Sequence, residues 1–294
     1  MRRAGFSAAL FVAVAWGSIA DVAAQQVSAP SDGQFATEPQ RPKPPKFVTS
    51  CDVPRELVRL SASLPHFSRA LAEGKPVEII ALGSSSTAGS GASSPQASYP
   101  ARLQAELLRR FPGRDIEVHN FGVGGQMARD MLERIEANVL PMKPSLVIWQ
   151  TGVNDAVQDV GVEAFRQTLE RGIKLLKAEG VDVILVDMQF YPKSERVAGY
   201  RDYLRAMRTA AESNAVGYFP RHAIMKHMVR SGQHSPEQLL APDNFHLNDL
   251  SYGCLADLMA DGIEAQLKGG RLDSANRLSD SFLQKQDASR HDWH

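Results

Sequence analysis

Five short apolar runs, alternating with longer segments of helical spacing, constrain the fold of this chain more than any other feature. The runs cover residues 77–82, 116–120, 145–150, 181–188 and 216–219. Helical periodicity is found over residues 99–111, 128–140, 162–179, 195–214 and 249–268. Strands that alternate with helices of this length form parallel βαβ units, because two parallel strands need a long crossover between them. The pattern predicts an α/β fold: a three-layer α/β/α sandwich with a mostly parallel sheet of about five strands.

The flanks of this alternating region have a different composition. Residues 1–24 combine a basic start, an apolar core and a small-residue cleavage site, as in a secretory signal peptide. Residues 25–50 hold five prolines among polar residues and predict an extended linker. We expect one folded domain over residues 51–269 and a frayed, polar C-terminal tail over residues 270–294. The expected protein is periplasmic or secreted, with no transmembrane segment in its mature chain.

Charge and cysteine content narrow the possible partners. The chain has 33 basic and 33 acidic residues, and no basic cluster alternates with aromatic residues, so nucleic acid is not an expected partner. Cys51 and Cys254 are the two cysteines, and in an oxidising compartment such a pair predicts a disulfide. It would stabilise the fold by at most roughly 5 kcal/mol, and two free thiols are the alternative. No metal-binding or cofactor-binding motif occurs, so neither kind of group is expected.

The first apolar run ends abruptly at Gly83-Ser84-Ser85-Ser86-Thr87. Ligands of open α/β sheets bind beyond the carboxyl ends of the strands, so these hydroxyls lie where a nucleophile would be useful. A Gly-Ser-rich turn more often only connects two elements. A nucleophilic role for Ser85 therefore depends on partners elsewhere in the chain.

Three later segments carry the groups that such a serine needs. They are a glycine-rich stretch at residues 119–125, the sequence Gly-Val-Asn-Asp at residues 152–155, and Asp-Asn-Phe-His at residues 243–246. Each has a structural alternative, since glycines permit tight turns and Asn or Asp cap helices. Together they supply a histidine base, a carboxylate that orients it, and N–H donors for the oxyanion of a tetrahedral intermediate.

In their order and spacing, the four segments resemble the sequence blocks of the SGNH (GDSL-type) hydrolase superfamily. The match assigns Ser85 as the nucleophile, with Asp243 and His246 completing a catalytic triad. It assigns the backbone N–H groups of Ser85 and Gly125 and the side chain of Asn154 as oxyanion donors. The resemblance covers residues 77–267 and implies a flavodoxin-like sheet and an esterase that needs no cofactor.

One residue departs from the family pattern. Ser84 stands where the family has an aspartate. That aspartate is not the triad acid, so the catalytic residues are complete. Its absence removes a negative charge and a hydrogen-bond acceptor beside the nucleophile.

These inferences predict an exported serine esterase that hydrolyses carboxylic esters through an acyl-enzyme. The resemblance to the SGNH superfamily implies acetylated polysaccharides, lipids and small aryl or alkyl esters as candidate substrates. Export from the cytoplasm favours O-acetyl groups on glycans among them. Two alternatives remain: a transferase that passes the acyl group to a sugar hydroxyl, and a non-catalytic glycan-binding relative. Gln150 and Gln189, which follow apolar runs, are expected either to line the substrate pocket or to cap their strands.

Overall fold

The computed structural model describes residues 51–288 of the chain, with side chains as far as Lys268. The predicted signal peptide and linker, residues 1–24 and 25–50, lie outside the described residues, as do residues 289–294 of the predicted tail. Within the described part, no helix combines the length and the apolar composition that crossing a membrane requires.

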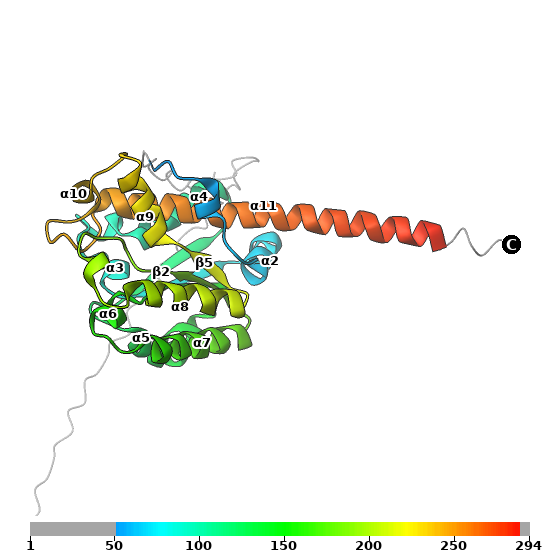
Figure 1. Ribbon diagram of the computed structural model, residues 1–294. Helices are drawn as coiled ribbons and strands as arrows, with labels where there is room; N and C mark the ends of the chain where they lie inside the picture. Colours follow the sequence, from blue (N-terminus) through cyan, green and yellow to red (C-terminus); the bar gives the residue numbers. More distant parts are fainter. Residues whose placement is uncertain (1–50, 289–294) are drawn as a thin grey trace, which may run out of the picture. The chain divides into compact units, whose positions relative to one another are not determined.

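A parallel sheet lies at the centre of the fold and confirms the predicted fold class (Figure 1). Its five strands have the order β2-β1-β3-β4-β5, which is the flavodoxin-like order. They are β1 (Val77–Gly83), β2 (Ile116–Gly122), β3 (Leu146–Gln150), β4 (Asp182–Val186) and β5 (Gly217–Phe219). The chain passes from β1 to β2 on one side and reaches β3 on the other. The carboxyl ends of β1 and β3 therefore flank the point where the strand order reverses.

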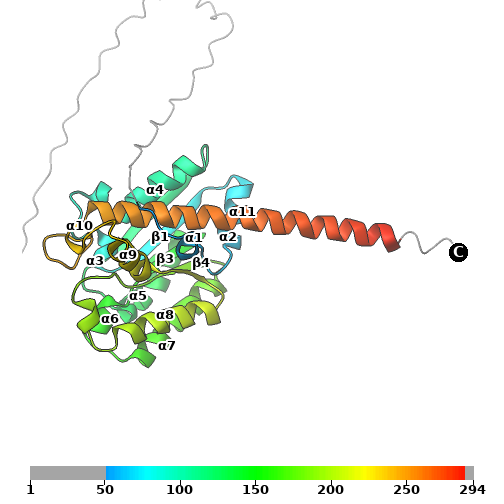
Figure 2. The ribbon, with the colours of Figure 1, turned by 45° about the horizontal axis from the view of Figure 1, so that its top comes forward.

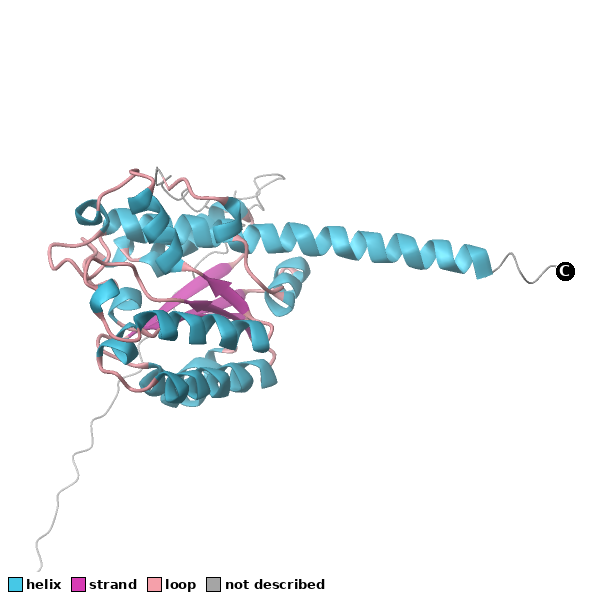
Figure 3. Cartoon of the chain, in the orientation of Figure 1, coloured by secondary structure: helices cyan, strands magenta, loops and turns pink. Residues whose placement is uncertain are grey.

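Helices cover both faces of the sheet, as Figures 1 and 3 show. Helices α5, α7 and α8 lie on one face, and α4 and α11 lie on the other, which is clear in Figure 2. The helices are α1 (Arg55–Val58), α2 (Pro65–Glu73), α3 (Ser85–Ala88), α4 (Tyr99–Arg110), α5 (Ala128–Arg134), α6 (Val153–Val157), α7 (Val162–Ala178), α8 (Tyr200–Ser213), α9 (Arg221–Arg230), α10 (Pro236–Leu239) and α11 (Asp249–Ala288).

Three of the predicted helices differ from the structure by more than one residue at an end. The segment 128–140 divides into α5, a π-helical turn (Ile135–Val139) and a 3-10 turn (Leu140–Met142), where Pro141 has no N–H for a continued helix. Helix α8 begins at Tyr200, after Gly199 in the left-handed conformation, rather than near residue 195. Helix α11 continues to Ala288, so the prediction of a frayed tail from residue 270 was wrong.

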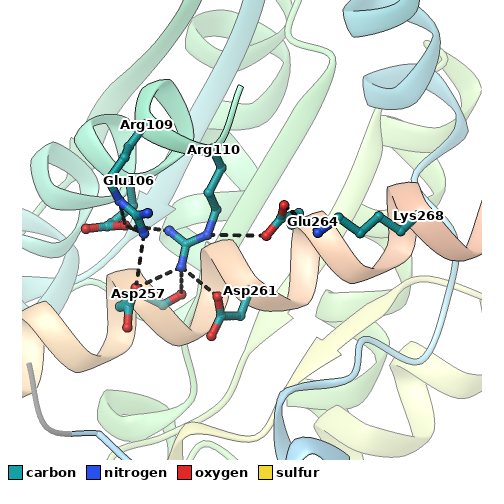
Figure 4. A network of polar contacts seen from close by, with 7 residues as sticks. All are labelled: Glu106, Arg109, Arg110, Asp257, Asp261, Glu264 and Lys268. Atoms are coloured by element: carbon teal, nitrogen blue, oxygen red, sulfur yellow. Dashed lines mark hydrogen bonds and ion pairs between the residues drawn. The ribbon is translucent and has the colours of Figure 1, made fainter. Parts of the chain in front are cut away.

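A buried arginine joins α4 to α11, the two helices on one face of the sheet (Figure 4). The side chain of Arg110 is only 6% exposed and binds Asp257 at 2.8 Å and Asp261 at 2.6 Å on α11. It also binds Glu106 on its own helix at 2.5 Å. A buried cation surrounded by carboxylates needs all of these contacts to offset its desolvation. The cluster therefore fixes how α11 lies on α4.

The disulfide expected from the sequence joins Cys51 to Cys254, whose Cα atoms lie 5.5 Å apart. Cys254 belongs to α11, so this bond attaches the first described residues of the chain to the helix that follows residues 243–246. It links positions separated by 203 residues, a separation at which a cross-link strongly restricts the unfolded chain.

Candidate active site

Ser85 begins α3 directly beyond the end of β1. Of the three consecutive serines, Ser84 and Ser86 are buried, whereas Ser85 is partly exposed. The first N–H groups of a helix have no acceptor within that helix, so the backbone N–H of Ser85 lies where it can bind an anionic oxygen. The local fold thus distinguishes Ser85 from its neighbours by exposure.

A histidine and an aspartate from the other end of the sequence lie in line with Ser85. The Nε2 atom of His246 is 2.9 Å from the Oγ of Ser85, across a sequence separation of 161 residues. Its Nδ1 atom is 2.6 Å from an oxygen of Asp243. One imidazole therefore bridges the serine hydroxyl and the carboxylate, with one ring nitrogen for each.

The loop that carries both residues is held by its own hydrogen bonds. The second oxygen of Asp243 accepts the backbone N–H groups of Phe245 at 3.0 Å and His246 at 2.9 Å. Partial burial alone would raise the pKa of Asp243, but these bonds and the imidazole outweigh it and lower the pKa below its ordinary value. The carboxylate form is therefore favoured beside His246.

Gly125 lies on the loop between β2 and α5, and Asn154 lies in α6, just beyond the end of β3. The side-chain amide of Asn154 donates one N–H to the carbonyl of Gln126 at 2.8 Å, which orients the amide and leaves its second N–H for another acceptor. Gly125 has a φ of +77°, and a Cβ placed there would meet no atom within 4 Å. Space in front of this glycine allows a substrate oxygen to approach its backbone.

Asp155, also in α6, attaches this helix to the start of α5. Its buried carboxylate accepts the backbone N–H of Ala128, at the start of α5, at 3.1 and 3.2 Å. Burial raises the pKa of Asp155 to about 6, and the hydrogen bonds that it accepts limit that rise. This role of Asp155 was not predicted from the sequence, where its only signal is its place next to Asn154 in the Gly-Val-Asn-Asp segment.

Two glycines allow the segments of the site to approach closely. A Cβ at Gly122, the last residue of β2, would lie 2.0 Å from the backbone nitrogen of Ala88 in α3. A Cβ at Gly91 would lie 2.4 Å from the carbonyl oxygen of Leu247 and 3.1 Å from the Cβ of His246. Only glycine therefore lets β2 reach the serine helix and lets the loop after that helix reach the histidine loop.

Gln150 contacts the residues on either side of Ser85 and Ser86 rather than lining an open pocket. It is fully buried, and its side-chain oxygen accepts the backbone N–H of Ser84 and the hydroxyl of Ser84, both at 3.2 Å. The same oxygen accepts the hydroxyl of Thr87 at 3.0 Å, and Thr87 also contacts the hydroxyl of Tyr99 at 3.3 Å. An uncharged serine at position 84 thus takes part in a neutral hydrogen-bond network beneath Ser85.

Gln189 is also buried, so its side chain does not face an open pocket either. It contacts the guanidinium of Arg221 at 3.0 Å and the carbonyl of Phe245, the residue before His246, at 3.4 Å. Arg221 was not identified from the sequence, because an arginine at the start of a helix is usually exposed. No sequence signal marks it as buried.

One group of acidic and histidine side chains within the described residues has donor atoms close enough to hold a metal ion: Glu78, Glu117 and His119. It lies on β1 and β2 and includes no residue of the Ser85 site. Nε2 of His119 is 2.5 Å from Glu78, and Nδ1 is 3.8 Å from Glu117. Each residue offers one ligand atom, and these atoms lie within 4.8 Å of one another, but Glu117 is exposed and such acidic groups are common without an ion. Contacts of the imidazole with two carboxylates account for the arrangement.

Comparison with known proteins places the chain in a family. The model described as the Non-GDSL lipase-like family matches residues 50–269. An uncharacterized lipoprotein, YqeF of Bacillus subtilis, is 30% identical over 128 residues, which is 41% of this chain and 52% of the lipoprotein. An arylesterase of Vibrio mimicus is 25% identical over 136 residues, which is 46% of this chain and 66% of the arylesterase. The chain thus spans between about half and two thirds of the length of these curated relatives.

A solved structure agrees with the fold. A two-domain esterase (CEX) active on acetylated mannans superposes with a TM-score of 0.63 at 21% identity, over 74% of this chain and 57% of that one. The family model covers all four segments that resemble SGNH sequence blocks. We conclude that the chain belongs to the Non-GDSL lipase-like family.

Proposed function

We propose that the chain is an exported serine esterase that hydrolyses carboxylic esters through an acyl-enzyme. The observation that carries this proposal is the line of contacts from Asp243 through His246 to Ser85, at 2.6 and 2.9 Å. The name of the Vibrio mimicus relative, an arylesterase, supports the same class of reaction.

The first half of the reaction forms the acyl-enzyme. The hydroxyl oxygen of Ser85 attacks the ester carbonyl carbon while its proton passes to Nε2 of His246. Asp243 stabilises the resulting imidazolium through its contact with Nδ1. The carbonyl oxygen becomes an oxyanion and accepts N–H groups from Ser85, Gly125 and Asn154. The C–O bond to the alcohol then breaks, and the alcohol leaves with the proton from His246.

The second half returns the enzyme to its starting state. A water molecule gives a proton to Nε2 of His246 as its oxygen attacks the acyl carbon. The same donors stabilise the second oxyanion. The bond to Ser85 breaks, its oxygen recovers the proton from His246, and the carboxylic acid leaves.

The proposed substrates are short-chain acyl esters, with O-acetyl groups on glycans first among them. The solved structure that shares the fold is an esterase active on acetylated mannans, which supports this choice. Export is supported by the Cys51–Cys254 disulfide, because such bonds persist in oxidising compartments. Cell fractionation of the chain with and without residues 1–24 would test this location: only the chain with these residues should be exported.

A nucleophile assay tests the proposal. Wild-type protein should hydrolyse p-nitrophenyl acetate and take a fluorophosphonate label, and Ser85→Ala should do neither. Ser86→Ala is the matched control, because it removes a buried hydroxyl one residue away, and it should retain both properties. Folded wild-type protein that takes no label would rule out a serine esterase.

The choice of substrate needs its own experiment. Acetate release from an acetylated mannan should be compared with hydrolysis of p-nitrophenyl acetate, butyrate and octanoate. The proposal expects the acetylated glycan and the acetate ester to be preferred. A preference for octanoate would exclude the short-chain class. Transfer of the acetyl group to an added mannan, in place of its release, would identify a transferase.

A further inference from the structure

Arg221 is a buried cation that the proposed reaction does not use. It is the first residue of α9, and its side chain is only 1% exposed. Its Nε atom donates to the backbone carbonyl of Asp187 at 2.8 Å, and Nη2 donates to the side-chain oxygen of Gln189 at 3.0 Å. Among the described residues, its Nη1 atom is buried without a hydrogen-bond partner. An unpaired buried N–H lowers stability, so stability alone is a poor explanation for this arginine.

The guanidinium determines which way the amide of Gln189 is turned. Arginine can only donate hydrogen bonds, so the amide oxygen of Gln189 must face Arg221. The amide nitrogen then faces the opposite side, where the carbonyl oxygen of Phe245 lies at 3.4 Å. The backbone of Gln189 is held as well, because the hydroxyl of Tyr200 donates to its carbonyl at 2.7 Å.

Phe245 connects Gln189 to the imidazole. Its ring packs edge-on against the ring of His246, with centroids 4.9 Å apart, and against Tyr191, with centroids 5.0 Å apart. The backbone of Phe245 is thus held by Gln189 on one side and by Asp243 on the other. A displacement of Phe245 would move the imidazole that must meet Ser85.

We propose that Gln189 and Arg221 are positioning residues for His246. Gln189 holds the backbone of the histidine loop through Phe245, and Arg221 acts through Gln189 by fixing the orientation of its amide. This inference rests on the proposed function for the role of His246. It goes further by assigning a role to two buried residues behind the triad.

The variant Gln189→Glu tests the hydrogen bond to the loop. Beside Arg221 the new carboxylate stays ionised, so it keeps the contact with the guanidinium but cannot donate to Phe245. We expect kcat per fluorophosphonate-labelled serine to fall roughly tenfold, with KM changed less than about twofold, because a small displacement of a catalytic group lowers the rate of the chemical step. Gln167→Glu, on the exposed surface of α7, makes the same change of charge and should leave both constants unchanged.

A double-variant cycle tests whether Arg221 acts through Gln189. Arg221→Lys keeps the positive charge and loses the paired donor geometry, so it should lower kcat several-fold. Gln189→Leu removes the amide altogether. Adding Arg221→Lys to Gln189→Leu should lower kcat no further, because the contact that the arginine controls is already absent. Fully additive losses would overturn the proposed relay.

Amide hydrogen exchange separates a failure of this inference from a failure of the proposed function. Exchange across residues 240–248 should be faster in Gln189→Glu than in wild type and unchanged in Gln167→Glu. Wild-type kcat and wild-type exchange in Gln189→Glu would overturn the positioning role. Faster exchange in a protein whose wild type takes no label would overturn the esterase and keep Gln189 as the residue that holds this loop.

Discussion

Two buried aspartates at opposite ends of the sheet make the same kind of contact. Asp155 follows β3 at the carboxyl end and accepts the backbone N–H of Ala128, at the start of α5. Asp182 begins β4 at the amino end and accepts the backbone N–H of Phe67, in the first turn of α2, at 2.9 Å. Burial raises the pKa of each carboxyl to about 6. The first contact attaches the N-terminus of α5 to α6, just beyond β3, and the second attaches the N-terminus of α2 to β4.

The two contacts differ in what the attached helix carries with it. Helix α5 follows the loop of Gly125, whereas α2 carries none of the residues assigned to the reaction. Both aspartates should therefore affect folding, and only Asp155 should affect catalysis. We therefore expect a buried polar contact to have a functional role when it lies at the carboxyl end of the sheet, because the candidate site gathers there.

Histidines at the two ends should give the largest difference. We expect His246→Ala to lower kcat for p-nitrophenyl acetate on the order of 10³-fold, since Ser85 loses its base. His66→Ala, on α2 at the amino end, should leave kcat within about twofold of wild type. A loss of kcat in His66→Ala comparable to that in His246→Ala would show that the amino end of the sheet also affects catalysis.

Variants of Arg110 test whether weakening the contact between α4 and α11 also changes catalysis. Arg110→Met leaves Glu106, Asp257 and Asp261 without their buried cation and should lower the free energy of unfolding by about 3 kcal/mol. Urea unfolding measures this change. The matched variant is Arg109→Met, because Arg109 also binds Glu106 but is 43% exposed, and it should lower stability by less than about 1 kcal/mol. A fall in kcat per labelled serine in Arg110→Met would show that the position of α11 affects the position of the histidine loop.

The aspartates themselves are the direct test. Asp155→Ala and Asp182→Ala remove the same group and should each lower the free energy of unfolding by about 1–3 kcal/mol. Only Asp155→Ala should also lower kcat per labelled serine, on the order of tenfold, because the Gly125 loop loses its attachment to the Asn154 segment. Equal values of kcat in the two variants would show that the oxyanion loops keep their positions without Asp155.

The sheet and the long helices could be predicted because burial repeats regularly along them. In α7, Leu169, Ile173 and Leu176 recur at helical spacing and are all buried. Helix α2 was not predicted, because only Phe67 and Leu71 are buried in it and two positions establish no periodicity. The boundaries failed where a single residue decides the backbone, as Gly199 does before α8.

The residues brought together at the site could be predicted from polar side chains beyond strand ends, as with Ser85 and Asn154. Their supporting contacts could not. Arg221 and Gln189 are 32 residues apart in sequence, and Gln189 and Phe245 are 56 apart. Whether such side chains meet depends on the packing of β4, α9 and the histidine loop, and sequence periodicity does not contain that packing.

The smallest expected effect is the pH dependence of the stability that Asp182 contributes at the amino end of the sheet. The folded protein keeps the proton of Asp182 up to about pH 6, whereas the unfolded chain releases it near the ordinary pKa of 3.8. Between these values the folded state binds more protons, so the contribution of Asp182 to stability falls as the pH rises through this window and is constant above it. Asp182→Asn has no such titration. Its free energy of unfolding relative to wild type should therefore rise by about 1–2 kcal/mol between pH 4 and pH 7, after allowance for solvent screening.

Urea unfolding of both proteins measures this difference, from which the titrations of other groups cancel. A difference independent of pH would mean that Asp182 has the same pKa in the folded and unfolded protein. The two aspartates would then no longer be equivalent.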